Sequence, residues 1–135
     1  MFDTKIAVVP RDDLETWPAL NVTAFLITGI AAHFPEIIGE PYLDATGNTS
    51  NSLSVQPIVV LSADAATIAK IHRRSLERDA RTSLYVDEMF ATYHDDANRA
   101  VFRQFSPEGA RVVGIALRAE RKIVDKITKG ARMHP

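Results

Sequence analysis

Charged side chains follow two strand-like segments of the sequence. Arg11, Asp12 and Asp13 come directly after one apolar run, and Asp87 and Glu88 end another. Open α/β sheets bind their ligands outside the carboxyl ends of the strands. We therefore predict a site for a small polar or anionic ligand that includes Arg11, Asp13 and Asp87.

Further candidates lie just downstream of Asp87. Thr92 offers a hydroxyl and His94 an imidazole that titrates near neutral pH, so with the carboxylate they provide the groups of general acid–base chemistry. Each group also has a plain structural alternative, because Asp95 and Asp96 are good helix caps and His94 can be a surface residue. No second histidine stands at a ligand spacing such as i+4, so no metal site is predicted.

Standard catalytic motifs are absent from the sequence. There is no glycine-rich dinucleotide or phosphate loop, no nucleophile elbow and no zinc-binding His-Glu-x-x-His. The chain also has no cysteine, which removes thiol nucleophiles and disulfides and agrees with a reducing compartment. These absences disfavour nucleotide-dependent enzymes and serine or zinc hydrolases, and we predict no cofactor.

The elements that must position these residues alternate between strand and helix. Short apolar, β-branched runs predict strands, and apolar residues at helical spacing predict helices. The predicted strands are 5–9, 57–61, 82–86 and 111–117; the predicted helices are 22–34, 65–78, 95–104 and 118–129. Helical crossovers between apolar strands predict one α/β domain over residues 1–135, a three-layer α/β/α sandwich with a mixed or mainly parallel four-stranded sheet.

The apolar segment 22–34 is the most unusual of the helices. We predict a loop before it, anchored by Trp17, and Asn21 as its N-cap. Because almost every residue of 22–34 is apolar or small, no polar stripe marks a solvent face, and we expect burial on most sides. Small residues in this segment would permit close approach, either within the chain or to a second subunit, so a homodimer is one expectation.

Residues 40–56 form the least compact stretch of the chain. The segment is rich in Ser, Thr and Asn, and it predicts either a hairpin that turns at Gly47 and Asn48 or a mobile flap. It is also longer than most connections in compact domains, which favours a functional loop.

The balance of charge differs between the two halves of the chain. The net charge is only −1, but residues 1–69 hold two basic and eight acidic side chains, and residues 70–135 hold fourteen basic and nine acidic ones. This indicates either an ordinary solvated exterior or a basic face for phosphate or an acidic partner. The near-neutral total makes nucleic acid an unlikely partner. The run 22–34 is too short to span a bilayer, so we predict a soluble, cytoplasmic protein with no membrane partner.

The order of these segments resembles that of the peptidyl-tRNA hydrolase II family. The resemblance lies in Lys5-Ile-Ala-Val-Val9, in Arg11-Asp-Asp-Leu14, in residues 31–32, in Gln56-Pro-Ile-Val-Val60, in Ser83-Leu-Tyr-Val-Asp87, in Arg111-Val-Val-Gly-Ile115 and in Ile123-Val-Asp-Lys-Ile-Thr128. Within that fold, the chain looks like a member of an uncharacterised bacterial family.

The resemblance also implies site residues. The hydrolases use a lysine near the start of the first helix, an aspartate after the third strand and a threonine shortly after that aspartate. Asp87 matches the aspartate and Thr92 stands near the threonine, but Asn21 occupies the place of the lysine, and residues 89–105 look like an insertion. Asparagine supplies neutral hydrogen bonds where lysine supplies a charge, so the family's reaction is not simply inherited.

Three hypotheses follow. The first is a ligand-binding relative of the hydrolases whose altered chemistry is centred on Asp87 as base or water-orienter, with Asn21, Thr92 and His94 positioning the substrate. The second is a non-catalytic, homodimeric binding domain. The third is peptidyl-tRNA hydrolase activity itself.

Overall fold

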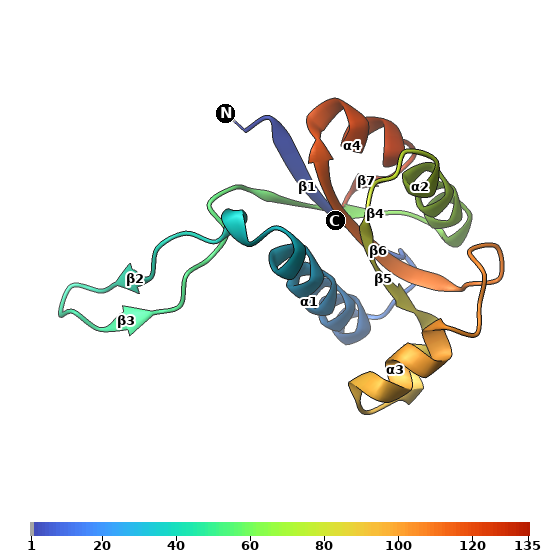
Figure 1. Ribbon diagram of the computed structural model, residues 1–135, viewed down its shortest axis with the longest axis horizontal. Helices are drawn as coiled ribbons and strands as arrows, with labels where there is room; N and C mark the ends of the chain where they lie inside the picture. Colours follow the sequence, from blue (N-terminus) through green and yellow to red (C-terminus); the bar gives the residue numbers. More distant parts are fainter. Residues whose placement is uncertain (1) are drawn as a thin grey trace.

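The computed structural model describes residues 2–135 and is built around one five-stranded sheet (Figure 1). The strands of this sheet are β1 (Thr4–Pro10), β4 (Ile58–Ser62), β5 (Thr82–Val86), β6 (Val112–Glu120) and β7 (Arg132–Met133). The α-helices are α1 (Thr16–His33), α2 (Ala65–Glu77), α3 (Asp95–Phe102) and α4 (Arg121–Ile127), and two short 3₁₀ helices are η1 (Pro35–Ile37) and η2 (Asp87–Ala91). Two further strands, β2 (Tyr42–Leu43) and β3 (Thr49–Ser50), form a separate hairpin.

The sheet is mixed, with the order β5-β6-β1-β4-β7. β1 pairs with β4 in parallel, whereas β6 runs antiparallel to both β1 and β5. The carboxyl ends of β1, β4 and β5 therefore lie at the same edge, as the predicted site requires. The prediction of four strands was wrong by one, because the two residues of β7 pair with Leu61 and Ser62 at the far side of the sheet. So short a strand has no periodicity in the sequence.

Helices cover both faces of the sheet, as the three-layer prediction requires. Ile6 and Val8 of β1 pack toward α1, whereas Ala7 and Val9 pack into the core shared with α2 and α4. This alternation follows from the two-residue period of a strand, whose successive side chains point to opposite faces. The all-apolar β1 is thus a strand that is buried on both sides.

Helix α1 begins earlier than its sequence predicts. It starts at Thr16, so Trp17 lies in its first turn and is 67% exposed, and Asn21 lies inside the helix. The predictions of a loop anchored by Trp17 and of Asn21 as the N-cap were therefore wrong. Pro18 indicated a loop, but it stands in the first turn, where proline removes no intrahelical hydrogen bond.

Only one face of α1 is fully buried. Val22, Leu26 and Ile30 recur every four residues and face the sheet, whereas Leu20 and Phe25 are more than half exposed. The expectation of burial on most sides was wrong for a single copy of the chain. The apolar outer side of α1 is left open to contact.

The ends of the other helices follow local capping. The Asp64 carboxylate accepts from the backbone N–H of Thr67 at 2.8 Å and caps α2. At α3 the cap is His94, whose Nδ1 accepts from the N–H of Ala97 at 3.3 Å, and neither Asp95 nor Asp96 takes this role. These two residues instead place negative charge in the first turn, where the helix dipole favours it.

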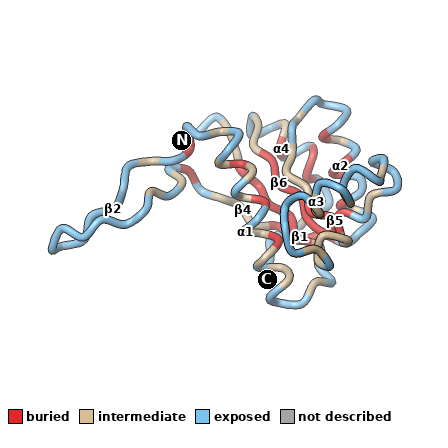
Figure 2. The backbone as a smooth tube through the Cα atoms, turned by 60° about the horizontal axis from the view of Figure 1, so that its bottom comes forward, coloured by how far each residue is buried: buried red, intermediate tan, exposed pale blue. Residues whose placement is uncertain are grey.

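The predicted hairpin extends from the body as a long arm, which we define as residues 39–55 (Figures 1 and 2). Its tip is closed by Asp44, which accepts hydrogen bonds from the side chain and backbone of Asn48 and from the backbone of Thr46. These bonds, led by that from the Asn48 side chain, lower the pKa of Asp44 to about 2. Gly47 has a φ of +90°, which suits glycine at such a tip.

In the part of the chain that the structure describes, no helix is both long enough and apolar enough to cross a membrane.

A glycine sets the distance between α1 and the sheet. A Cβ atom at Gly114 of β6 would lie 2.4 Å from Val22 Cγ1 and 3.0 Å from Leu26 Cδ1. We expect Gly114→Ala to lower the free energy of unfolding by about 1–3 kcal/mol, because overpacking pushes α1 away. Urea denaturation measures this change. Gly109→Ala is the matched control, since its Cβ would meet nothing closer than 3.9 Å; equal losses in both variants would contradict the close contact.

Candidate functional site

A cavity of about 320 Å³ lies at the carboxyl end of β5, between α1, η2 and the start of α3. We call it the Tyr85 pocket. It unites three of the predicted site residues, Asn21, Thr92 and His94, from separate segments. Its remaining lining residues are Trp17, Phe25, Tyr85, Met89, Phe90, Tyr93, Asp95 and Asn98.

The aromatic wall of the pocket is built from α1, β5 and η2. The ring of Tyr85 packs edge to face against Phe25, with the centroids 5.9 Å apart, and lies 5.1 Å from the ring of Phe90. Trp17, Asn21 and Phe25 are spaced by four residues, so they form one stripe along α1. The start of α1 at Thr16 is what brings Trp17 into this stripe.

Two polar groups of the pocket hold its own backbone in place. The Thr92 hydroxyl contacts the carbonyl oxygen of Met89 at 2.9 Å and also contacts Asn98 Oδ1. His94 Nδ1 is occupied as the cap of α3. Thr92 and His94 therefore fix the turn between η2 and α3, and the Nε2 atom of His94 is the ring nitrogen left for other partners.

Two other polar groups line the pocket without such a role. Among residues 2–135, neither the amide of Asn21 nor the hydroxyl of Tyr85 has a hydrogen-bond partner in the chain. Tyr85 is only 7% exposed, and its burial raises the pKa of the phenol above its ordinary value. The hydroxyl thus stays protonated at neutral pH and can donate a hydrogen bond.

The structure does not bring all the predicted residues together. Asp87 begins η2, where its backbone N–H donates to the carbonyl of Arg111 at 2.9 Å, and it is not among the residues that line the Tyr85 pocket. Arg11 and Asp13 pair with each other at 2.5 Å. The predicted set is divided, with Asn21, Thr92 and His94 in one cavity and the other three residues outside it.

Arg11 lines a different cavity, of about 490 Å³, beside α2 and the segment before β6. Arg73 and Arg111 also line it, but each of these three cations is paired: Arg11 with Asp13, Arg73 with Glu77 and Arg111 with Glu88. His72, which also lines it, has its pKa lowered by burial. The positive charge in this cavity is therefore largely neutralised, which disfavours a dedicated anion site.

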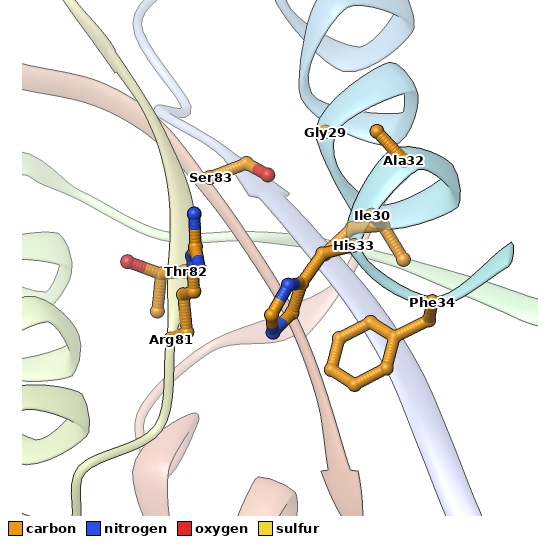
Figure 3. Close-up of a pocket in the computed structure, with 8 residues that line it drawn as sticks. All are labelled: Gly29, Ile30, Ala32, His33, Phe34, Arg81, Thr82 and Ser83. Carbon is orange, nitrogen blue, oxygen red and sulfur yellow. The ribbon is translucent and has the colours of Figure 1, made fainter.

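A third hollow, of about 340 Å³, lies at the opposite end of β5 (Figure 3). His33 at the end of α1 and Arg81 before β5 stand on its two sides, and the ring of His33 packs edge to face against Phe34. The strand and the helix approach closely here, since a Cβ at Gly29 would lie 2.3 Å from Ser83 Oγ. None of the predicted site residues lies in this hollow.

The sequence interpretation missed the aromatic residues of the Tyr85 pocket. Tyr85, Phe90 and Tyr93 were present as a cluster around the end of a predicted strand, and that clustering was the available signal. Trp17 was assigned to a loop, so its place on α1 was not foreseen. For metals, the described residues contain no group of three or more His, Cys, Asp or Glu side chains that could hold an ion.

Comparisons with known proteins give a family and a solved relative. A family model described as "Protein of unknown function (DUF2000)" matches residues 4–135. The structure is similar to that of the protein of unknown function Atu0240 from Agrobacterium tumefaciens strain C58, with 67% sequence identity, a TM-score of 0.98 and coverage of 100% of both chains. No curated protein matches the chain. The resemblance to the peptidyl-tRNA hydrolase II family stays a prediction.

The floor of the pocket depends on an ion pair that holds η2. Arg111 donates to Glu88 Oε1 from Nη2 at 2.5 Å and from Nε at 3.1 Å, which lowers the pKa of Glu88 below its ordinary 4.5. A lowered carboxyl pKa stabilises the fold above pH 4.5, and this contribution is lost as the pH falls through the lowered value. We therefore expect Arg111→Met to reduce the melting temperature at pH 7, with a deficit that shrinks toward pH 3.

Thermal melts of both proteins from pH 3 to pH 7 measure this difference. Arg78→Met is the control, because Arg78 is exposed on the opposite layer and has no ion-pair partner among residues 2–135. A deficit for Arg111→Met that is constant across the pH range would show that the Glu88 pair is not its cause.

Proposed function

Since the chain belongs to the DUF2000 family, whose description is of unknown function, we propose from its own site that it binds a small, uncharged, planar molecule with polar substituents. The binding site is the Tyr85 pocket. One observation carries the proposal: the unpartnered Asn21 amide and Tyr85 hydroxyl line one cavity together with several aromatic side chains.

The aromatic lining favours a flat ligand. Trp17, Phe25, Tyr85, Phe90 and Tyr93 line a volume of about 320 Å³, which is within the range of small-molecule pockets. Stacked or edge-to-face arrangements of aromatic rings contribute about 0.5–1.5 kcal/mol beyond the area that they bury. A single heterocyclic ring is a ligand of suitable size and shape.

The polar groups select for hydrogen-bonding substituents on that ring. The amide of Asn21 can both donate and accept, and the phenol of Tyr85 is held in its donating form. Both groups are free to pair with a ligand, so a ligand that pairs with both gains affinity over one that pairs with neither. This supports binding of an amide-, carbonyl- or amino-substituted ring.

The charges around the pocket favour a neutral ligand over an anionic one. No lysine or arginine is among the described residues that line it, and the carboxylate of Asp95 is neutralised by Arg99 at 2.7 Å. From the sequence we expected a polar or anionic ligand, and from the lining of the pocket we propose a polar, uncharged one. The same charges give no support to phosphate binding of the kind that a peptidyl-tRNA substrate requires.

We propose binding without assigning a reaction. Asp87 is not among the residues that line the cavity, while Thr92 and His94 Nδ1 already have partners in the chain. A catalytic role for Asp87 stays a prediction, as do ligand contacts of Arg11 and Asp13. What the pocket offers is recognition of a ring and of its polar edge.

Trp17 provides a direct test, because it is the only tryptophan in the chain and lines the pocket. We expect titration with a panel of nicotinamide, cytosine and uracil to change the tryptophan fluorescence saturably for at least one member. Asn21→Leu and Tyr85→Phe should each weaken that binding about 10-fold or more, because each removes a hydrogen-bond partner but keeps most of the shape.

Arg73→Met is the matched control, because Arg73 lines the cavity beside α2 and not the Tyr85 pocket, and we expect it to leave the affinity unchanged. Binding that Arg73→Met abolishes and that Asn21→Leu and Tyr85→Phe leave intact would place the ligand in the cavity beside α2 and contradict the proposal. No fluorescence change with any of the three compounds at millimolar concentration would also contradict the proposal.

A further inference from the structure

The arm of residues 39–55 leaves apolar side chains uncovered. Leu43 is 71% exposed, and Tyr42, Leu53 and Val55 are each more than half exposed. A two-stranded hairpin that packs on nothing is at best marginally stable in water. Exposed apolar groups on an ordered arm therefore indicate a partner that covers it (Figure 2).

The solved relative has the arm in the same position. Residues 39–55 are about an eighth of the chain, and the two structures superpose over the whole length of both. A relative whose arm took a different direction could not match this closely. The arm therefore extends from the body in the same way in both proteins.

The body of the chain has a groove that fits such an arm. It lies between α1 and α3 along the edge strand β5 and has a volume of about 740 Å³. We call it the α1–α3 groove. Phe25, Met89, Phe102 and Phe105 provide apolar surface in it. On the α3 side Arg99 is paired with Asp95, which also lines the groove, whereas Arg103 has no ion-pair partner among residues 2–135. The groove therefore combines apolar surface with the unpaired charge of Arg103.

The charges of the arm and the groove are complementary. No lysine or arginine occurs between Arg11 and Lys70, so the charged side chains of the arm are the acidic Glu40 and Asp44 alone. The groove has the opposite character on its α3 side, where Arg103 has no ion-pair partner among residues 2–135. The same chain thus supplies both an acidic, apolar arm and a groove suited to receive it.

We propose that the protein forms a homodimer in which the arm of each copy lies in the α1–α3 groove of the other copy. A two-fold axis makes the two contacts equivalent, so every arm and every groove is covered. At about 3.3 Å per residue, the eight residues from Gly39 to Thr46 reach roughly 26 Å, which is longer than the eight-residue helix α3 at about 12 Å. The groove shares Phe25, Tyr85, Met89, Asp95 and Asn98 with the Tyr85 pocket, so the arm would lie beside the ligand site, but the dimer itself requires no bound ligand.

Single substitutions on either side of the contact test the dimer. We expect light scattering at 50 µM to give twice the 14.9 kDa chain mass for the unmodified protein. Leu43→Asp in the arm and Phe102→Asp in the groove should each give the monomer mass. Met133→Asp is the control, because Met133 is an exposed residue of β7, at the opposite edge of the sheet from β5, and this variant should remain a dimer.

Mixing the two monomeric variants tests the exchange itself. Leu43→Asp keeps a native groove and Phe102→Asp keeps a native arm, so one intact arm–groove contact is possible only between different chains. We expect an equimolar mixture to form a heterodimer, whereas neither variant self-associates. Far-UV circular dichroism and melting temperatures close to those of the unmodified protein confirm that both variants are folded.

Three outcomes would overturn the proposal. These are an unmodified protein that is monomeric at 50 µM, a dimer that persists in Leu43→Asp or Phe102→Asp, and two monomeric variants that do not associate on mixing. The last result would mean that the two copies meet through another surface and that the arm of one does not lie in the groove of the other.

Discussion

The close contact of α1 with β6 at Gly114 is the constraint on which the rest of the structure depends. Because no side chain stands at this position, Val22 and Leu26 reach the backbone of the sheet. Gly114 is also the residue opposite Tyr85 in the neighbouring strand. The depth at which α1 lies therefore decides how the stripe of Trp17, Asn21 and Phe25 meets Tyr85, and so whether a pocket exists.

Polar groups at this edge of the sheet have one of two roles. Some hold the backbone around the pocket in place, and others line the pocket without a partner in the chain. The cap at His94, the Thr92 hydroxyl and the Glu88–Arg111 pair all satisfy groups of the chain itself. The Asn21 amide and the Tyr85 hydroxyl have no partner among residues 2–135, and both line the Tyr85 pocket. They are therefore the groups through which the pocket can recognise a ligand.

Much of the layered fold could be predicted from the sequence, since buried strands such as 82–86 and amphipathic helices such as α2 have clear periodicities. The start of α1 could not, because Pro18 is equally compatible with a loop and with a first helical turn. The pair of residues in β7 has no pattern at all. Of the predicted site residues, Asn21, Thr92 and His94 line one cavity, but their convergence with aromatic residues depends on tertiary packing that no local pattern contains.

Backbone hydrogen bonds at the base of the arm let its length vary among relatives without a change in the rest of the fold. Gly39 N–H donates to Leu53 O at 3.0 Å and Val55 N–H to Ile37 O at 2.7 Å, so the two ends of the arm are joined where it leaves the body. Lengthening or shortening the segment beyond these bonds changes the loop-closure entropy only slightly and disturbs no core contact. Insertions or deletions in the arm are therefore compatible with the same core and the same sheet.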